Sequence, residues 1–165
     1  DIYAAGDVAE AFDIILGVKR LIPIWPKAYH EGRTAGFNMA GEGKKSVGSL
    51  AMNSADFFGF PTISAGLVNP NEKDECEILS EYHEDERCYK KLVLKDRRLV
   101  GMVLMGDAVD RAGILLNLIK QRVDVETFKD SLMERNFGLI SFPRDLVADR
   151  FEGVFPTEIQ TKRQI

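Results

Sequence analysis

The sequence predicts an α+β fold, in which a strand and a long helix precede a mixed or antiparallel sheet with helices packed on it. Three observations support this prediction. An apolar run over residues 2–5 stops at Gly6, as a buried strand does at a turn. A helical pattern begins at Pro26 and runs to about Ala40. Beyond residue 60, short apolar runs alternate with turn residues, which is typical of strands.

Composition excludes several classes of protein. The 165 residues are 45% hydrophobic and 29% charged, as in an ordinary soluble globular protein. A net charge of −4 argues against nucleic acid as the main partner, because phosphate binding needs a basic surface. No apolar run approaches the roughly 20 residues of a membrane span. Two cysteines without a CxxC motif fit a reducing, cytoplasmic compartment.

The first part of the chain is expected to be a strand and a helix. The strand over residues 2–5 lacks its beginning, and the chain opens without an initiator Met or a signal peptide, as a fragment of a longer protein would. Pro26 fixes φ at a helix start. Small residues recur at intervals of three and four, so another backbone or a flat ligand could lie close to that face; they are Ala28, Gly32, Ala35, Gly36 and Ala40.

The character of the chain changes after Lys45. Residues 46–60 cross through small side chains into an aromatic cluster, Phe57, Phe58 and Phe60. We therefore predict two domains, residues 1–45 and residues 46–165.

The second part is expected to form a sheet with helices. Four strands are predicted, namely Pro61–Val68, Glu75–Tyr82, Tyr89–Leu94 and Leu99–Met105. The last strand is apolar on both faces, which predicts a central position covered on both sides. Residues 95–98 join the last two strands in a tight hairpin. Helices are expected over residues 112–122 and 125–133, before an irregular tail from Asn136.

The dipeptide Gly6-Asp7 is the first candidate site. A carboxylate just beyond a strand can accept hydrogen bonds from the hydroxyl groups of a ribose-like chain. The same arrangement of apolar strand, Gly-Asp and helix recurs at Gly106-Asp107, where we interpret Asp107 as the N-cap of the helix. The dipeptide alone leaves both roles open for Asp7.

A longer pattern distinguishes them. The segments DIYAAGDVAE and IPIWPKAYHEGRTAGFNMAGEG resemble the closing part of the FAD domain in the pyridine nucleotide-disulfide oxidoreductases. The resemblance is greatest to the branch of rubredoxin reductases, NADH oxidases and the flavoprotein region of NADH-dependent nitrite reductase. It implies that Gly6-Asp7 belongs to the second FAD fingerprint and that Asp7 binds the ribityl chain. It also implies that the helix opening at Trp25 points its N-terminus at the pyrimidine edge of the flavin.

The second implied contact agrees with helix electrostatics. The first turn of a helix has unpaired N–H groups and partial positive charge. Reduced flavin carries negative charge near N1 and O2, so this helix end would raise its redox potential. Pro26 has no N–H group, and the expected donors are therefore Trp25 and Lys27.

The resemblance extends to about residue 122. The segments YKKLVL and RLVGMVLMGD resemble the hairpin of the C-terminal domain in the same branch. Relatives tend to have Gly after the Asp of this turn, where this chain has Arg97. We therefore expect Arg97 at positive φ, with some strain.

Several expected signatures of complete enzymes are absent from the sequence. It contains no GxGxxG fingerprint and no CxxxxC redox pair. It also lacks the His-Pro dyad that the disulfide reductases of this superfamily carry in their last domain, since no Pro follows His83. Cys76, His83 and Cys88 lack a familiar zinc spacing, so no metal site is predicted. His30 is interpreted as a surface or packing residue. The acidic residues between 72 and 86 are interpreted as an exposed edge, with a docking face for a basic redox partner as the alternative.

The predicted function follows from the resemblance. The chain is expected to be a C-terminal fragment of an FAD-dependent NAD(P)H oxidoreductase, which passes electrons through FAD to rubredoxin, a quinone, oxygen or a nitrite-reducing centre. FAD belongs to the complete parent, and the fragment alone is expected to be empty and inactive. Its expected partners are the remaining FAD and NAD(P)H domains and a second copy bound through the C-terminal domain. The alternative is a cofactor-free interaction or dimerisation module.

Overall fold

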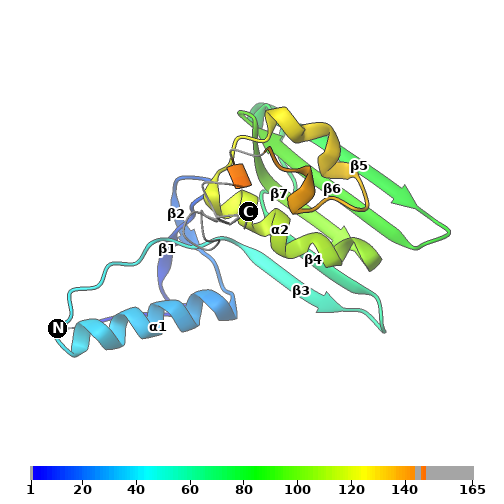
Figure 1. The fold of residues 1–165 in the computed structure, drawn as a ribbon. Coiled ribbons are helices and arrows are strands. Elements are labelled where there is room, and N and C mark those ends of the chain that lie inside the picture. The colour runs from blue at the N-terminus through cyan, green and yellow to red at the C-terminus, as the bar shows by residue number, and fades with distance from the viewer. Residues whose placement is uncertain (1, 144–145, 148–165) are drawn as a thin grey trace, which may run out of the picture.

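The computed structural model describes residues 2–143 and 146–147 of the chain (Figure 1). It confirms the α+β class, and over these residues it shows the α-helices α1 and α2, several 3-10 turns and two antiparallel sheets. The strands are β1 (Glu10–Phe12), β2 (Lys19–Leu21), β3 (Met52–Asp56), β4 (Pro61–Gly66), β5 (Glu77–His83), β6 (Cys88–Lys95) and β7 (Arg98–Met105). The helices are α1 (Trp25–Met39) and α2 (Ala112–Gln121). The 3-10 turns are η1 (Glu72–Asp74), η2 (Gly106–Arg111), η3 (Glu126–Met133) and η4 (Leu139–Ser141).

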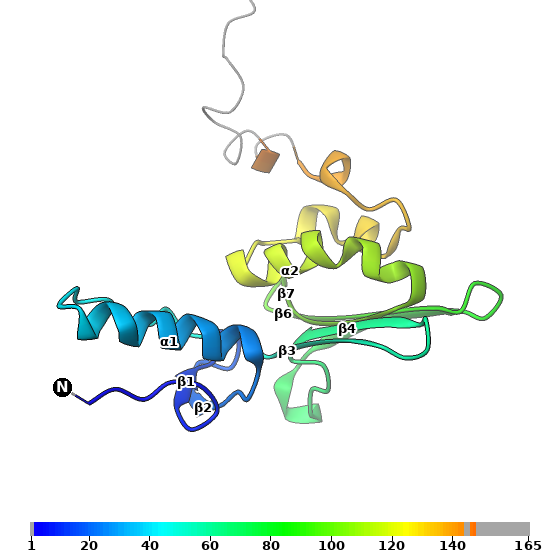
Figure 2. The same cartoon turned by 90° about the horizontal axis from the view of Figure 1, so that it is seen from below.

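The main sheet has five antiparallel strands in the order β3-β4-β7-β6-β5. Strand β7 is central, as its apolar sequence predicts. Figure 2 shows α2 and the turns after it stacked on one face of this sheet, with α1 set to one side. The small ribbon β1-β2 lies next to α1.

The hydrophobic core lies between α2 and the sheet. Leu92, Met102 and Leu104 point to this face because they alternate with outward residues along their strands, and none of the three is exposed. Leu115 and Leu118 of α2 are equally buried against them. Each such side chain contributes roughly 1.5–3 kcal/mol on burial, so this layer holds the second part of the chain together.

The opposite face of the sheet, which we call the outer face, carries Ile78, Tyr82, Tyr89, Val103 and Met105. The strand register places Tyr82, Tyr89 and Met105 side by side. The side chains of Ile78 and Tyr82 are exposed. Helix α2 covers the opposite face, while part of the outer face lies under the connection between β4 and β5, where Lys91 hydrogen-bonds to Asn69 and Val93 is fully buried. The prediction that β7 is covered on both sides therefore holds in part, because a helix covers one side and a loop covers only some of the other.

The β6–β7 turn confirms the prediction for Arg97. Asp96 and Arg97 have φ values of 49° and 62°, in the left-handed region that disfavours side chains. Contacts hold Arg97 there. Its Nη2 lies 2.9 Å from Oδ2 of Asp124, and its carbonyl accepts a 2.9 Å hydrogen bond from the N–H of Val125.

The prediction of a strand over residues 2–5 is wrong for the described structure. The segment is extended but unpaired, and the side chain of Ile2 is 99% exposed. An apolar run forms a strand only beside another strand, and none within the described ranges lies next to it. Strands β1, β2 and β3 were not predicted, because two have three residues and β3 has the polar sequence MNSAD.

Asp107 is not the N-cap that the sequence suggested. Gly106, at φ 63°, turns the chain into η2, and no side chain caps either η2 or α2. The chain thus makes a 3-10 turn before the α-helix begins, which displaces Asp107 from the capping position. The segment predicted as a helix over residues 125–133 forms η3, with a kink at Phe128 where φ is −133°.

Candidate cofactor-contacting site

The first turn of α1 presents free backbone donors. Ile24 is extended before the helix, and Pro26 lies in the first turn, which contains no acidic residue. The N–H of Ala28 donates to the carbonyl of Ile24 at 3.1 Å, so the N–H groups of Trp25 and Lys27 precede this first hydrogen bond of the helix. The side chain of Trp25 is 82% exposed. This end of the helix therefore keeps its partial positive charge available to a ligand.

Residues 6–9 form a tight turn against the same helix. Gly6 has a φ of +82°, and its carbonyl accepts a 2.9 Å hydrogen bond from the N–H of Ala9. A Cβ added at Gly6 would lie 3.6 Å from the Cβ of Ala28. Glycine is required here mainly by the positive φ, which other residues adopt only with strain.

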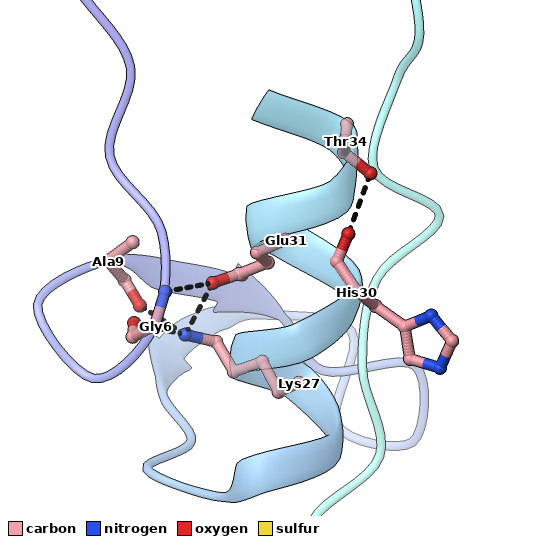
Figure 3. Close-up of polar contacts among 6 residues, drawn as sticks. All are labelled: Gly6, Ala9, Lys27, His30, Glu31 and Thr34. Atoms are coloured by element: carbon pink, nitrogen blue, oxygen red, sulfur yellow. Dashed lines mark hydrogen bonds and ion pairs between the residues drawn. The ribbon is translucent and has the colours of Figure 1, made fainter. Parts of the chain in front are cut away.

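Lys27 and Glu31 hold the turn and the helix together (Figure 3). The Nζ of Lys27 donates to the carbonyls of Gly6 at 2.8 Å and Ala9 at 2.6 Å. It also lies 2.9 Å from Oε2 of Glu31, one turn further along α1. That carboxylate oxygen accepts a 3.0 Å hydrogen bond from the N–H of Gly6.

The lysine in this network is buried and fully satisfied. Lys27 is 3% exposed, and the three donors of its ammonium group have three acceptors. A buried ion pair stabilises a structure only when its remaining polar groups are also hydrogen-bonded, as they are here. The Lys27 side chain is therefore a positioning group, which fixes the turn at Gly6 against the first turns of α1.

The structure places the four predicted site residues unequally. Gly6 and Lys27 are in direct contact. Asp7 follows Gly6 and is exposed, and its carboxylate makes no hydrogen bond or ion pair with any residue that the structure describes. Sequence reasoning assigned Lys27 a backbone role and missed its side chain and Glu31. Their i, i+4 spacing is the signal that could have revealed the pair.

The small-residue face of α1 is open over much of its length. A Cβ added at Gly32 or Gly36 would meet nothing within 4 Å. In the part of the chain that the structure describes, close packing therefore does not explain these two glycines. Ala28 of this face lies against the Gly6 turn.

A cavity of about 600 Å³ adjoins the first turn of α1. His30 lines it, and Figure 3 shows the His30 ring pointing away from the Lys27–Glu31 pair. Its walls combine apolar side chains from β1 and the approach to β3 with basic groups at the end of α2, namely Phe12, Ile14, Val47, Leu50, Met52, Lys120 and Arg122. The prediction that His30 lies on the surface is consistent with its exposed side chain.

No metal-binding cluster accompanies this site among the described residues. Within residues 2–143 and 146–147, no group of three His, Cys, Asp or Glu side chains could hold a metal ion. Cys76 and Cys88 are free thiols. No helix in the same ranges is long and apolar enough to cross a membrane.

Comparison with known proteins identifies similar proteins, and the matching family model covers the main sheet and α2. Residues 52–123 match the family described as rubredoxin NAD+ reductase C-terminal domain. The chain is 31% identical over 135 residues to a nitrite reductase [NAD(P)H] of Bacillus subtilis, a match that covers 81% of this chain and 16% of the relative. It is 33% identical over 127 residues to an NADH oxidase of Lactococcus lactis, covering 68% of this chain and 28% of the relative.

The fold is also found in a solved structure. A crystal structure of an FAD-dependent pyridine nucleotide-disulphide oxidoreductase from Desulfovibrio vulgaris superposes with a TM-score of 0.67 at 22% identity. The match covers 91% of this chain and 38% of that protein. The chain thus spans less than two thirds of the length of each of these proteins.

Proposed function

Because this chain belongs to the pyridine nucleotide-disulfide oxidoreductase family and matches the C-terminal part of its members, we propose that it completes the flavin site of an FAD-dependent NAD(P)H oxidoreductase. In this proposal, residues 1–45 close the FAD domain and residues 46–165 form the domain that covers it. The single observation that carries the proposal is the Lys27–Glu31 network, which fixes the Gly6 turn against α1.

The residues present fit a flavin chemically. Asp7 offers an exposed carboxylate without a partner among the described residues, which suits the hydroxyl groups of a ribityl chain. The first turn of α1 offers free N–H groups with no acidic side chain to compete for them. Both features lie next to one buried network, so a ligand that binds both would find them already positioned.

Each residue then has a distinct role. Asp7 accepts hydrogen bonds from the ribityl hydroxyl groups, and the N–H groups of Trp25 and Lys27 stabilise negative charge at the pyrimidine edge. These groups would hold FAD, which would supply the capacity to take up a hydride from a nicotinamide and to pass electrons to an acceptor. The side chain of Lys27 does not contact the flavin; it keeps Gly6, and with it Asp7, in register with the helix.

The electron acceptor in this proposal is rubredoxin, a quinone, oxygen or a nitrite-reducing centre. We place the complete protein in the cytoplasm, in keeping with its two free thiols. These 165 residues alone are expected to be inactive, because hydride transfer needs two nucleotides held face to face. Purification followed by an absorbance spectrum tests this expectation. A colourless protein agrees with it, whereas stoichiometric bound FAD would show that the chain holds a flavin unaided.

The outer face favours a second candidate function, a cofactor-free interaction or dimerisation module. Ile78 is 48% exposed and Tyr82 64% exposed, and Tyr89 and Met105 lie beside them in the sheet. Sedimentation of the chain, alone and with Tyr82→Lys, separates the two candidates. A dimer abolished by the substitution, together with no flavin binding by the full-length protein, supports the interaction module. Flavin binding by the full-length protein supports the oxidoreductase.

A further inference from the structure

A second cavity lies away from the Gly6 turn and is not used by the proposed function. It has a volume of about 260 Å³ and lies near the β5–β6 hairpin, under η2 and the segment after η3. Cys88 and Lys90 of β6 both line it. The other lining residues are Glu81, His83, Asp107, Ala108, Asp110, Arg111, Met133, Arg135 and Asn136.

Lys90 is an unusual residue for a sheet face under helices. It pairs with Leu104 in the strand register, so it points to the core side, and it is 4% exposed. Its ammonium group has three donors, but Nζ makes one long hydrogen bond, 3.4 Å to the carbonyl of Glu134. No carboxylate of the described residues forms an ion pair with it. Lys27, by contrast, has all its donors satisfied.

The surroundings favour the neutral amine. Burial lowers the pKa of Lys90, and the guanidinium of Arg111 acts in the same direction. Glu81, Cys88 and Glu134 oppose the shift without reversing it. A lysine whose amine is neutral nearer to physiological pH is a better nucleophile than an ordinary surface lysine.

Cys88 supplies a second nucleophile in the same cavity. It lies two residues before Lys90 on β6, so the two side chains leave the same face of the strand, roughly 7 Å apart along it. The thiol is free and buried. A long, flexible lysine side chain can bridge this separation once a group is attached to the sulfur.

We propose that Cys88 and Lys90 form an acyl-acceptor site for thioesters of small, neutral acyl groups. The Cys88 sulfur attacks the thioester carbonyl; a new thioester bond forms, and the incoming thiol leaves with the proton. The Lys90 amine then attacks this carbonyl, an amide bond forms, and the Cys88 thiol is regenerated with the proton of the amine. No oxidation or reduction takes place.

Charge selects the acyl group. The cavity is lined by three carboxylates, Glu81, Asp107 and Asp110, against the two guanidinium groups of Arg111 and Arg135. A modification that adds a further negative charge is therefore disfavoured, whereas a neutral amide removes the unpaired ammonium group from a buried position. The amide keeps one N–H, which can still donate to the carbonyl of Glu134.

The test compares two neighbouring lysines in one sample. The chain is incubated with S-acetyl-N-acetylcysteamine, and acetylation of Lys90 and Lys91 is followed by mass spectrometry of peptides cut at Glu. Lys91 is the matched control because it lies on the outer face, where Nζ hydrogen-bonds to Asn69 at 3.3 Å. We expect Lys90 to react faster than Lys91 despite its burial. Cys88→Ser should lower the Lys90 rate about tenfold and leave Lys91 unchanged, because the effect is one of proximity.

The opposite results overturn the proposal. Slower reaction at Lys90 than at Lys91 would show that the amine is inaccessible. An unchanged acetylation rate of Lys90 in Cys88→Ser would show that the thiol takes no part in the reaction. A rise in the acetylation rates of both lysines in Cys88→Ser would show that the substitution had only opened the β5–β6 hairpin. A succinyl thioester provides the charge test. Equal acetylation and succinylation of Lys90 would contradict selection for a neutral acyl group.

Discussion

Lys27 contributes more to stability than the exposed Lys44 just after the helix, because its buried ammonium group holds three half-buried acceptors. Lys27→Met would take the ammonium donor from the carbonyl of Ala9 and the countercharge from the Glu31 carboxylate, which would keep only the N–H of Gly6 as a donor. Breaking a buried pair in this way costs about 3–5 kcal/mol. We expect the backbone amides of α1 in Lys27→Met to exchange their hydrogens with solvent at rates close to those of an unfolded segment. Lys44→Met is the control, because its ion pair with Glu42 is exposed and 3.7 Å long. Equal exchange in the two variants would refute the positioning role.

Lys90 has the opposite effect on stability, because its ammonium group is buried without an ion pair. Its pKa is lowered by burial below the ordinary value of 10.5. As pH falls from 10.5 through the lowered pKa, the unfolded chain takes up the proton first, so folding stability is lost in that window. We expect Lys90→Met to be more stable than the parent chain at pH 7 by about 1 kcal/mol or more. The difference should narrow as pH rises toward 10.5.

Denaturant unfolding of both chains between pH 7 and the lysine range checks this prediction, since titrations common to both cancel in the difference. A difference independent of pH would mean that the lysine keeps its ordinary pKa when folded. Because Lys90 reduces stability and yet lines a cavity, a chemical role explains its presence better than a structural one.

At the scale of elements, the β6–β7 turn combines backbone strain with a compensating ion pair. Arg97→Gly would relieve a left-handed residue, which is worth roughly 1–2 kcal/mol. It would also lose the exposed pair with Asp124, worth about 0–1 kcal/mol. We therefore expect a net gain of about 0.5–1 kcal/mol in the free energy of unfolding. Asp124→Asn measures the pair alone. If Arg97→Gly destabilised the chain more than Asp124→Asn does, the strain argument would fail.

Elements with a strong local signal could be predicted from the sequence. Helix α1 has Pro26 at its start and Gly41, at φ 90°, after its end. Strand β7 is apolar after its first residue, and the positive φ of Arg97 followed from the resemblance, because relatives tend to have Gly at that position. Strands β1 and β2 have three residues each, which is too short for periodicity to register. Residues 2–5 carry the apolar character of a strand, but whether they pair depends on a neighbouring strand that no local pattern reports.

The site was predictable only in part for the same reason. Gly6 and the start of α1 have sequence signatures, whereas their contact depends on how the chain folds back over about 20 residues. Lys27 and Glu31 resemble any exposed i, i+4 pair in the sequence, and only the tertiary structure buries them. The Cys88–Lys90 cavity is likewise invisible in sequence, because half of its lining comes from η2 and the segment after η3.

At the scale of the whole molecule, the chain combines a well-packed layer of α2 on a sheet with an N-terminal part that exposes many large apolar side chains. The core residues of the sheet are fully buried, while Asp7 and Trp25 face outward. The aligned relatives are much longer than this chain, which covers 16% of the nitrite reductase. In the proposed flavoprotein, the outward groups of residues 6–27 complete a binding site, and the packed layer supports them.

The most direct test of this account is the affinity of the full-length flavoprotein for FAD after Asp7→Asn. Asp7 is exposed and makes no contact among the described residues, so its loss should not change the free energy of unfolding of the apoprotein. We expect FAD binding, followed by the quenching of flavin fluorescence, to weaken by about 1 kcal/mol, because the Asn oxygen can still accept a hydrogen bond but without the charge of the carboxylate. Unchanged FAD affinity in a normally folded Asp7→Asn protein would contradict the account and make Asp7 a turn residue.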